Sequence, residues 1–168
     1  IKLYNGKTAE ILNTDAEGRL ILADALAYGE KQYSPKAIID FATLTGACIV
    51  ALGNNVAAIV SNNEQLTKKI TDSSKTTTEE IWELPLTQDY MDMIKSDVAD
   101  MKNVGIGRAA GTITAAAFLR NAIEETPWTH IDIAGVAWTQ GATKSKPYNP
   151  KGATGFGVRL ILDYLQKI

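Results

Sequence analysis

Short apolar runs separated by turn residues dominate the first half of the sequence. Residues 37–42 and 56–60 are such runs, and proline or glycine lies close to each of them. Runs of this length, apolar on both faces, are typical of interior strands in a mostly parallel sheet. Residues 128–134 alternate between apolar and polar side chains. This alternation predicts a further strand.

Helices are predicted between these strands. Residues 19–31 are apolar on nearly every side apart from Asp24, which predicts a buried helix. Residues 62–78 are polar and predict a solvated helix followed by a surface loop. We expect residues 79–96 to be helical on both sides of Pro85.

The second half of the chain is expected to contain two more helices and two long loops. Residues 97–111 are expected to form an irregular loop, after which Thr112 can cap a helix that runs to about Glu125. The polar residues 141–155 predict a long loop of the functional or interface type. Apolar residues recur at helical spacing in the last segment and predict an amphipathic closing helix: Val158, Ile161, Tyr164, Leu165 and Ile168.

The beginning of the chain predicts a hairpin. Asn5 and Gly6 favour a turn with positive φ at both central residues, and they lie between the expected strands 1–4 and 8–12. The numbering begins at Ile1, without Met and inside an expected strand, so we expect further residues upstream. Strands that alternate with helices predict an α/β fold, layered, with a mostly parallel or mixed sheet and helices on both faces. We expect a single domain over residues 1–168.

Composition and charge narrow the class of protein. The chain has 168 residues, of which 45% are hydrophobic and 21% charged, as in an ordinary globular domain. The formal charge is −2 and basic residues are scattered, so nucleic acid and anionic membrane surfaces are not expected partners. Cys48 is the only cysteine, which excludes an intrachain disulfide and favours a reducing, cytoplasmic compartment. No apolar run approaches the ~18 residues of a membrane span.

Two carboxylates and an arginine lie close together between the expected hairpin and the first helix. Asp15 and Glu17 are two residues apart and would point the same way on an extended backbone. Paired carboxylates at the end of a strand suit Zn, Mn or Mg, and Arg19 adds a fork of donors for a carboxylate, bicarbonate or oxyanion. The same string also fits an ordinary helix start, capped by Asn13 or Thr14, with acidic residues at the positive end of the helix dipole. Spacing alone leaves both interpretations open.

The longer string Asn-Thr-Asp-Ala-Glu-Gly-Arg-Leu, at residues 13–20, resembles the signature of the leucine (cytosol) aminopeptidase family. The resemblance continues in the same order over nearly the whole chain, through residues 22–26, 42–47, 51–53, 82–86, 105–111, 130–135 and 152–159. This ordered set of blocks is highly specific. It implies a metal-dependent aminopeptidase that releases N-terminal residues, with a broad preference that includes Leu.

The resemblance implies a role for each residue of the candidate site. Asp15 and Glu17 would bind metal, with Glu17 bridging two divalent ions, Zn or Mn. Arg19 would be the catalytic arginine, holding a bicarbonate that acts as general base. Two such cations activate water, polarise the peptide carbonyl and can anchor a free α-amino group. Substrate-lining positions are implied for six further residues: Asn13, Thr43, Leu44, Gly46, Ala134 and Ala137.

The resemblance also implies partners and a missing segment. In the family, upstream residues supply two lysines and two aspartates to the site, but only twelve residues precede Asn13 here. We therefore expect the N-terminal domain and the upstream metal-ligand segment to be absent, and this chain alone to be inactive and to bind metal weakly or not at all. Members of the family act on peptides with a free N-terminus and form hexamers. The alternative is a non-catalytic assembly or scaffold module of a hexameric protein.

Several other polar residues are interpreted as structural. His130, the only histidine, lies in an expected strand, which predicts a buried core histidine rather than a catalytic base. Asp24 is expected to be a satisfied structural carboxylate, whereas Asp97 and Asp100 are expected to be solvated loop charges. The glycines of residues 105–111 have the wrong spacing for a dinucleotide-binding loop and predict a loop with a permissive backbone.

Overall fold

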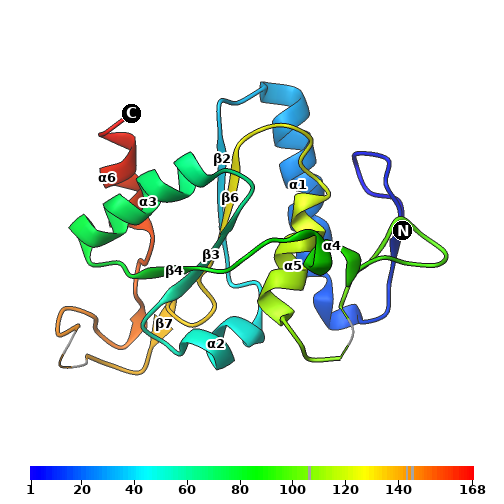
Figure 1. The fold of residues 1–168 in the computed structure, drawn as a ribbon. Coiled ribbons are helices and arrows are strands. Elements are labelled where there is room, and N and C mark those ends of the chain that lie inside the picture. The colour runs from blue at the N-terminus through cyan, green and yellow to red at the C-terminus, as the bar shows by residue number, and fades with distance from the viewer. Residues whose placement is uncertain (106, 143, 145) are drawn as a thin grey trace.

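The structure is a computed structural model that describes residues 1–105, 107–142, 144 and 146–168. Its centre is a four-stranded sheet in the order β2 (Ile38–Ala42), β6 (Trp128–Asp132), β3 (Ala57–Ser61) and β4 (Ile81–Glu83) (Figure 1). β2 runs parallel to β6 and β3 runs parallel to β4, but β3 and β6 are antiparallel. The predicted α/β fold is therefore confirmed, with a sheet of the mixed type.

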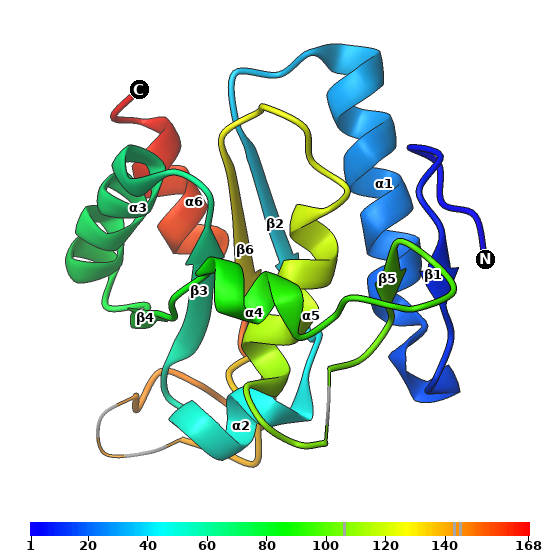
Figure 2. The same ribbon diagram turned by 45° about the vertical axis from the view of Figure 1, so that its right-hand side comes forward.

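Helices cover both faces of this sheet, as predicted. α1 (Gly18–Tyr33) and α5 (Gly111–Arg120) lie on one side, and α3 (Glu64–Thr77) and α6 (Val158–Leu165) lie on the other (Figures 1 and 2). Successive strand residues point to opposite faces, so β6 contributes Trp128 to the cluster with α1 and α5 and Ile131 to the cluster with α3 and α6. The two clusters form the hydrophobic core.

Shorter elements complete the fold. They are α2 (Gly46–Leu52), α4 (Gln88–Asp92), the parallel pair β1 (Ala9–Glu10) and β5 (Met101–Lys102), and the antiparallel pair β7 (Trp138–Thr139) and β8 (Gly152–Ala153). Within the described residues, no helix combines the length and the apolar character needed to cross a membrane.

The predicted helix over residues 79–96 is wrong in its first part. Residues 81–83 form the edge strand β4, and the backbone N–H of Leu84 continues the pairing by donating to the carbonyl of Ile59 at 2.9 Å. The ladder with β3 overrides the local helical preference, because strand formation depends on the neighbouring strand more than on propensity. Only α4, after Pro85, is helical.

Two helix boundaries also differ from the prediction. α5 begins at Gly111 after Ala110, whose left-handed φ is 50° and which makes no side-chain cap, so Thr112 is not the N-cap. The helix ends at Arg120 rather than near Glu125. The backbone N–H groups of residues 124–126 donate instead to the carboxylate of Glu30 on α1, which ends the helical pattern by a tertiary contact.

α1 is buried on one face only, contrary to the expectation of burial on nearly every side. Ala23, Leu26 and Ala27 pack into the core, whereas Ile21 is 69% exposed. The predicted turn at the N-terminus is present, since the Leu3 N–H donates to the Lys7 carbonyl at 2.8 Å. Among the described residues of this turn, Gly6 has positive φ (90°) and Asn5 does not.

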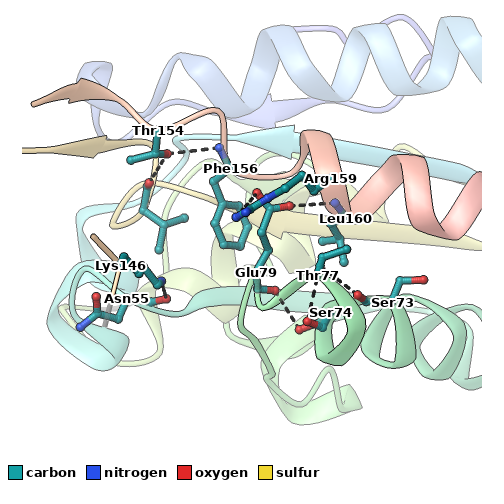
Figure 3. Close-up of polar contacts among 11 residues, drawn as sticks. Asn55, Ser73, Ser74, Thr77, Glu79, Lys146, Thr154, Phe156, Arg159 and Leu160 are labelled. Carbon is teal, nitrogen blue, oxygen red and sulfur yellow. Dashed lines mark hydrogen bonds and ion pairs between the residues drawn. The ribbon is translucent and has the colours of Figure 1, made fainter. Parts of the chain in front are cut away.

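The closing helix α6 is oriented by a buried carboxylate (Figure 3). Glu79 is 3% exposed, and its Oε2 accepts the Leu160 N–H at 2.8 Å while its Oε1 lies 3.5 Å from Nη2 of Arg159. A negative charge at this helix N-terminus stabilises the dipole. Leu160 and Tyr164 are buried as a result, whereas Val158, Leu165 and Ile168 of the predicted apolar set are more than half exposed.

Candidate active site

The Asn13–Arg19 string forms a tight turn followed by a helix. Asn13 caps a 3-10 turn, Thr14–Ala16, by accepting the Asp15 N–H on its side-chain oxygen at 2.9 Å. Glu17 begins α1 but makes no side-chain capping bond. The backbone is therefore not extended here, so Asp15 and Glu17 do not point the same way by strand alternation. The local structure matches the alternative interpretation, a helix start capped by Asn13.

The carboxylates of Asp15 and Glu17 lie at the surface. Both residues are exposed, and neither side chain accepts a hydrogen bond from the residues that the structure describes. Their oxygens thus remain available for a divalent cation, as the chemistry of the donor set requires. Within the described part of the chain, however, no group of three or more His, Cys, Asp or Glu side chains could hold a metal ion. The two carboxylates fit a metal site as part of its ligand set.

Arg19 lies in the first turn of α1 and points inward. The residue is 9% exposed, and its Nη1 donates to the main-chain carbonyl of Asn103 at 2.7 Å. Burial lowers the pKa of the guanidinium, and the nearby charge of Asp132 acts in the opposite direction. An arginine stays protonated under these conditions, so the site holds a fixed, largely desolvated cation.

Asn103 is a buried residue of the site that the sequence did not reveal. Its Oδ1 accepts the backbone N–H groups of Leu12 at 2.9 Å and Asn13 at 3.3 Å, and its Nδ2 donates to the Asn13 carbonyl at 2.6 Å. The side chain is fully buried. It lies in a segment expected to be irregular, where no periodicity marks an inward-facing residue, so no local signal could have identified it.

Asp132, at the end of β6, connects two loops that contain predicted substrate-lining residues. Its Oδ1 accepts the backbone N–H groups of Leu44 and Ala134, each at 3.1 Å, and its Oδ2 accepts the hydroxyl of Thr45 at 2.7 Å. Asp132 is fully buried. Because β2 and β6 are parallel, the loops that follow them emerge at the same edge of the sheet.

These two loops carry the remaining predicted site residues. Thr43 and Gly46 are exposed, whereas Leu44, Ala134 and Ala137 are partly buried. The second loop is compact, since the Ala137 N–H donates to the Ile133 carbonyl at 2.9 Å. A Cβ on Gly135 would lie 2.2 Å from the carbonyl oxygen of Gly53, so this loop packs backbone against backbone.

Thr45 joins the first loop to the helices beside it. Its hydroxyl accepts the Cys48 N–H at 3.1 Å, capping α2, and lies 2.9 Å from the hydroxyl of Thr112 on α5. Cys48 is buried, and burial together with the charge of Asp132 raises the pKa of its thiol. The predicted residues thus lie near two polar residues: Asn103 holds the Asn13–Arg19 string, and Asp132 holds the loops after β2 and β6.

Two interpretations of other polar residues are confirmed. His130 is a fully buried core histidine, and its Nδ1 lies 2.6 Å from Oδ1 of Asp40, whose Oδ2 accepts the indole N–H of Trp128 at 2.7 Å. Asp24 is structural, because its Oδ1 accepts the Tyr4 N–H at 2.8 Å.

Asp100 is more than the solvated loop charge that was expected. Its Oδ2 accepts both the backbone N–H of Thr8 at 2.6 Å and the Thr8 hydroxyl at 2.7 Å. These hydrogen bonds hold the pKa of the carboxyl below its usual range. The short β1–β5 pairing brings the two residues together, which spacing along the chain could not predict.

The glycines of residues 105–111 agree with the prediction of a loop that needs a permissive backbone. Gly107 has a left-handed φ of 64°, and a Cβ on Gly111 would lie 2.7 Å from the Cβ of Ala47 on α2. Ile106 lies outside the described residues, as do positions 143 and 145 of the predicted loop over residues 141–155.

Comparison with known proteins agrees with the sequence resemblance. The family described as cytosol aminopeptidase family, catalytic domain, matches residues 1–162. A probable cytosol aminopeptidase of Cenarchaeum symbiosum (strain A) is 73% identical over 166 residues, covering 99% of this chain and 34% of that protein. Proteins of the same description from Syntrophotalea carbinolica and Chlorobaculum tepidum are 53% and 56% identical, with 99% of this chain and 33% and 32% of each relative covered. The chain spans about a third of the length of these curated relatives. It belongs to the cytosol aminopeptidase family and matches that family's catalytic domain.

Proposed function

We propose that this chain forms part of the active site of a metal-dependent aminopeptidase that releases N-terminal residues, including Leu, from peptides. The observation that carries the proposal is the pair of exposed carboxylates, Asp15 and Glu17, directly before the buried guanidinium of Arg19, which donates to the Asn103 carbonyl at 2.7 Å. The two loops held by Asp132, which carry predicted substrate-lining residues, would complete the site, and the charge of Asp132 acts on the pKa of Arg19. The reaction class follows from the names of the relatives, which are probable cytosol aminopeptidases.

Asp15 and Glu17 would contribute carboxylate ligands to two divalent ions, Zn or Mn, with Glu17 as the bridge. When bound, such ions lower the pKa of a bound water and polarise the peptide carbonyl. A catalytic zinc normally takes three protein ligands and keeps one open position, so two carboxylates are too few for two ions. We expect the remaining ligands to come from the part of the longer relatives that this chain does not match. The chain alone is then expected to bind metal weakly and to be inactive.

Arg19 would bind a small anion beside the reacting carbonyl. One N–H of the guanidinium donates to Asn103, and its other donors have no hydrogen-bond partner among the described residues. The planar fork of donors suits a bicarbonate or a developing oxyanion. Since the residue is largely buried, its attraction to such an anion is stronger than it would be in bulk water.

The loops after β2 and β6 would form the wall for the substrate. Thr43 and Leu44 lie on one loop, with Gly46 at the start of α2 directly after it, and Ala134 and Ala137 lie on the other; Asp132 holds both loops. Small side chains on the second loop leave room for a large apolar first residue. The amide of Asn13, at the surface beside Asp15, would be a further contact for the peptide.

We extend the proposal to assembly and location. The family resemblance implies a hexamer, and apolar side chains available for subunit contacts are at least 66% exposed: Ile21, Val50, Trp82 and Val98. A solution mass measurement tests this, because a monomeric protein of the length of the relatives would contradict it. A cytoplasmic location agrees with the relatives' names and with the single cysteine.

A single substitution tests the catalytic proposal. Glu17→Gln, in a protein extended upstream to the length of the relatives, should lower hydrolysis of a leucyl chromogenic substrate by more than about 100-fold, since even residues behind the ligands cost 10–100-fold. Glu64→Gln is the matched control, because Glu64, like Glu17, is an exposed acid at the start of a helix. Undiminished turnover in the Glu17 variant would refute its role as a ligand.

A further inference from the structure

Asn103 lies at the junction between a short strand pair and the proposed catalytic string. Its backbone N–H donates to the Glu10 carbonyl at 2.9 Å, which continues the pairing of β1 with β5 by one residue. Figure 2 shows this pair beside the N-terminal half of α1. The pairing therefore places the buried side-chain amide of Asn103 next to Leu12 and Asn13, where the Asn13–Arg19 string begins.

The same residue holds both ends of that string. At the first end, the side chain forms three hydrogen bonds with the backbone of Leu12 and Asn13. At the other end, the main-chain carbonyl accepts the guanidinium of Arg19 at 2.7 Å. Asp15 and Glu17 lie between these two anchors, and their own side chains have no hydrogen-bond partner among the described residues.

We infer that Asn103 is a positioning residue for the reaction: it fixes the arrangement of Asp15, Glu17 and Arg19 without touching the substrate. This inference rests on the proposed function. A primary amide combines an acceptor for two N–H groups with a donor for the Asn13 carbonyl in one planar group, and it does so without taking up a proton. In Asn103→Asp the acceptor is kept, but a carboxylate oxygen replaces the Nδ2 donor, 2.6 Å from the Asn13 carbonyl oxygen. The two oxygens then repel each other.

The kinetic consequence follows from the geometry. Displacing a catalytic group by about 1 Å can cost on the order of 100-fold in rate. Asn103→Asp and Asn103→Ala should therefore lower kcat by about 10- to 100-fold. KM should change less than about threefold, because five of the six predicted substrate-lining positions follow β2 and β6, where Asp132 holds the chain. Asn62→Asp is the matched control: its amide also accepts a backbone N–H and donates to a backbone carbonyl, of Trp128 and Thr126, at a distance from the string.

A double-mutant cycle separates positioning from general structural damage. In the protein extended to the length of its relatives, Asn103→Asp should lower kcat by a smaller factor when Arg19 is already alanine than in the parent, because the part of its effect that passes through the position of Arg19 is then already lost. The same loss of kcat in both backgrounds would overturn the inference, as would kcat within about twofold of the parent for Asn103→Asp. Asn103→Asp decides the matter if the alanine variant does not fold.

Hydrogen exchange tests whether Asn103 holds the backbone of Leu12 and Asn13, independently of activity. The amides of Leu12 and Asn13 should exchange at least about tenfold faster in Asn103→Asp than in the parent, whereas the Trp128 amide should change only in the Asn62 variant. Unchanged exchange at residues 12 and 13 would overturn the inference. If the parent hydrolyses no leucyl substrate, the proposed function fails, and the exchange measurement still decides whether Asn103 holds the string.

Discussion

Replacing Asp132 by alanine should destabilise the protein severely. The carboxylate is fully buried and accepts the N–H groups of Leu44 and Ala134 and the hydroxyl of Thr45. Leaving a buried donor without a partner costs about 1–3 kcal/mol. The hydroxyl can turn to Thr112, 2.9 Å away, so the two N–H groups account for most of the penalty. We expect a loss of about 3–5 kcal/mol, against a total stability of roughly 5–15 kcal/mol for a domain.

An asparagine at position 132 should cost much less. Its carbonyl oxygen can still accept both N–H groups, and its amide can donate to Thr45, so the loss is chiefly that of the charge, about 1–2 kcal/mol. Asp97→Ala, at an exposed position, is the control and should stay within about 0.5 kcal/mol of the parent.

Urea unfolding followed by tryptophan fluorescence measures these differences as shifts of the midpoint at constant m-value. An alanine variant within about 0.5 kcal/mol of the parent would refute the reasoning, because the N–H groups of Leu44 and Ala134 would then have lost their acceptor without consequence. Equal losses for alanine and asparagine would also refute it, since the oxygen retained by asparagine would then have no effect.

Three further predictions concern other parts of the molecule. Burial raises the pKa of Glu30, but hydrogen bonds from the Thr126 side chain and the N–H groups of residues 124–126 outweigh it and lower the pKa below its ordinary value. The stability that Glu30 provides is therefore present above its unfolded pKa and lost as the pH falls through the folded value, so Glu30→Gln should flatten the decline of the urea midpoint between about pH 5 and pH 3. The buried thiol of Cys48, whose pKa is raised by burial and by Asp132, should react with Ellman's reagent at neutral pH only after unfolding; rapid labelling of the native protein would contradict its burial. Glu79→Gln should cost about 1–2 kcal/mol and increase proteolysis at α6, because the helix loses a buried charge at its N-terminus, whereas the exposed neighbour Glu80→Gln should have no measurable effect.

Local sequence patterns were sufficient to predict those strands whose own residues favour an extended backbone. The apolar runs at residues 37–42 and 56–60 became β2 and β3, and the alternating run at 128–134 became β6. The strand β4 was missed because its three residues are extended only through pairing with β3. The apolar composition of α1 indicated a helix but not which face would be buried, since that depends on α5 and the sheet.

The candidate site was predictable only in part for the same reason. The Asn13–Arg19 string stands out because its residues are adjacent in the sequence. The side chains of Asn103 and Asp132 form hydrogen bonds with residues that lie 87 to 91 positions away along the chain, apart from the bond to Ala134 two residues on. Asn103 is a single polar residue in a segment without periodicity, and Asp132 is a single charged residue at the end of a buried strand. Their place in the site depends on contacts between distant parts of the chain, which the spacing of residues in the sequence cannot predict.

The central claim is that Asp15, Glu17 and Arg19 form part of a peptidase site that other ligands complete. The most direct test compares this chain with a protein extended upstream to the length of the relatives, both supplied with Mn²⁺ or Zn²⁺ and a leucyl peptide. The extended protein should release free leucine from the N-terminus, and this chain alone should release none. Turnover by the chain alone would contradict the shared ligand set, and a folded but inactive extended protein would contradict the aminopeptidase itself.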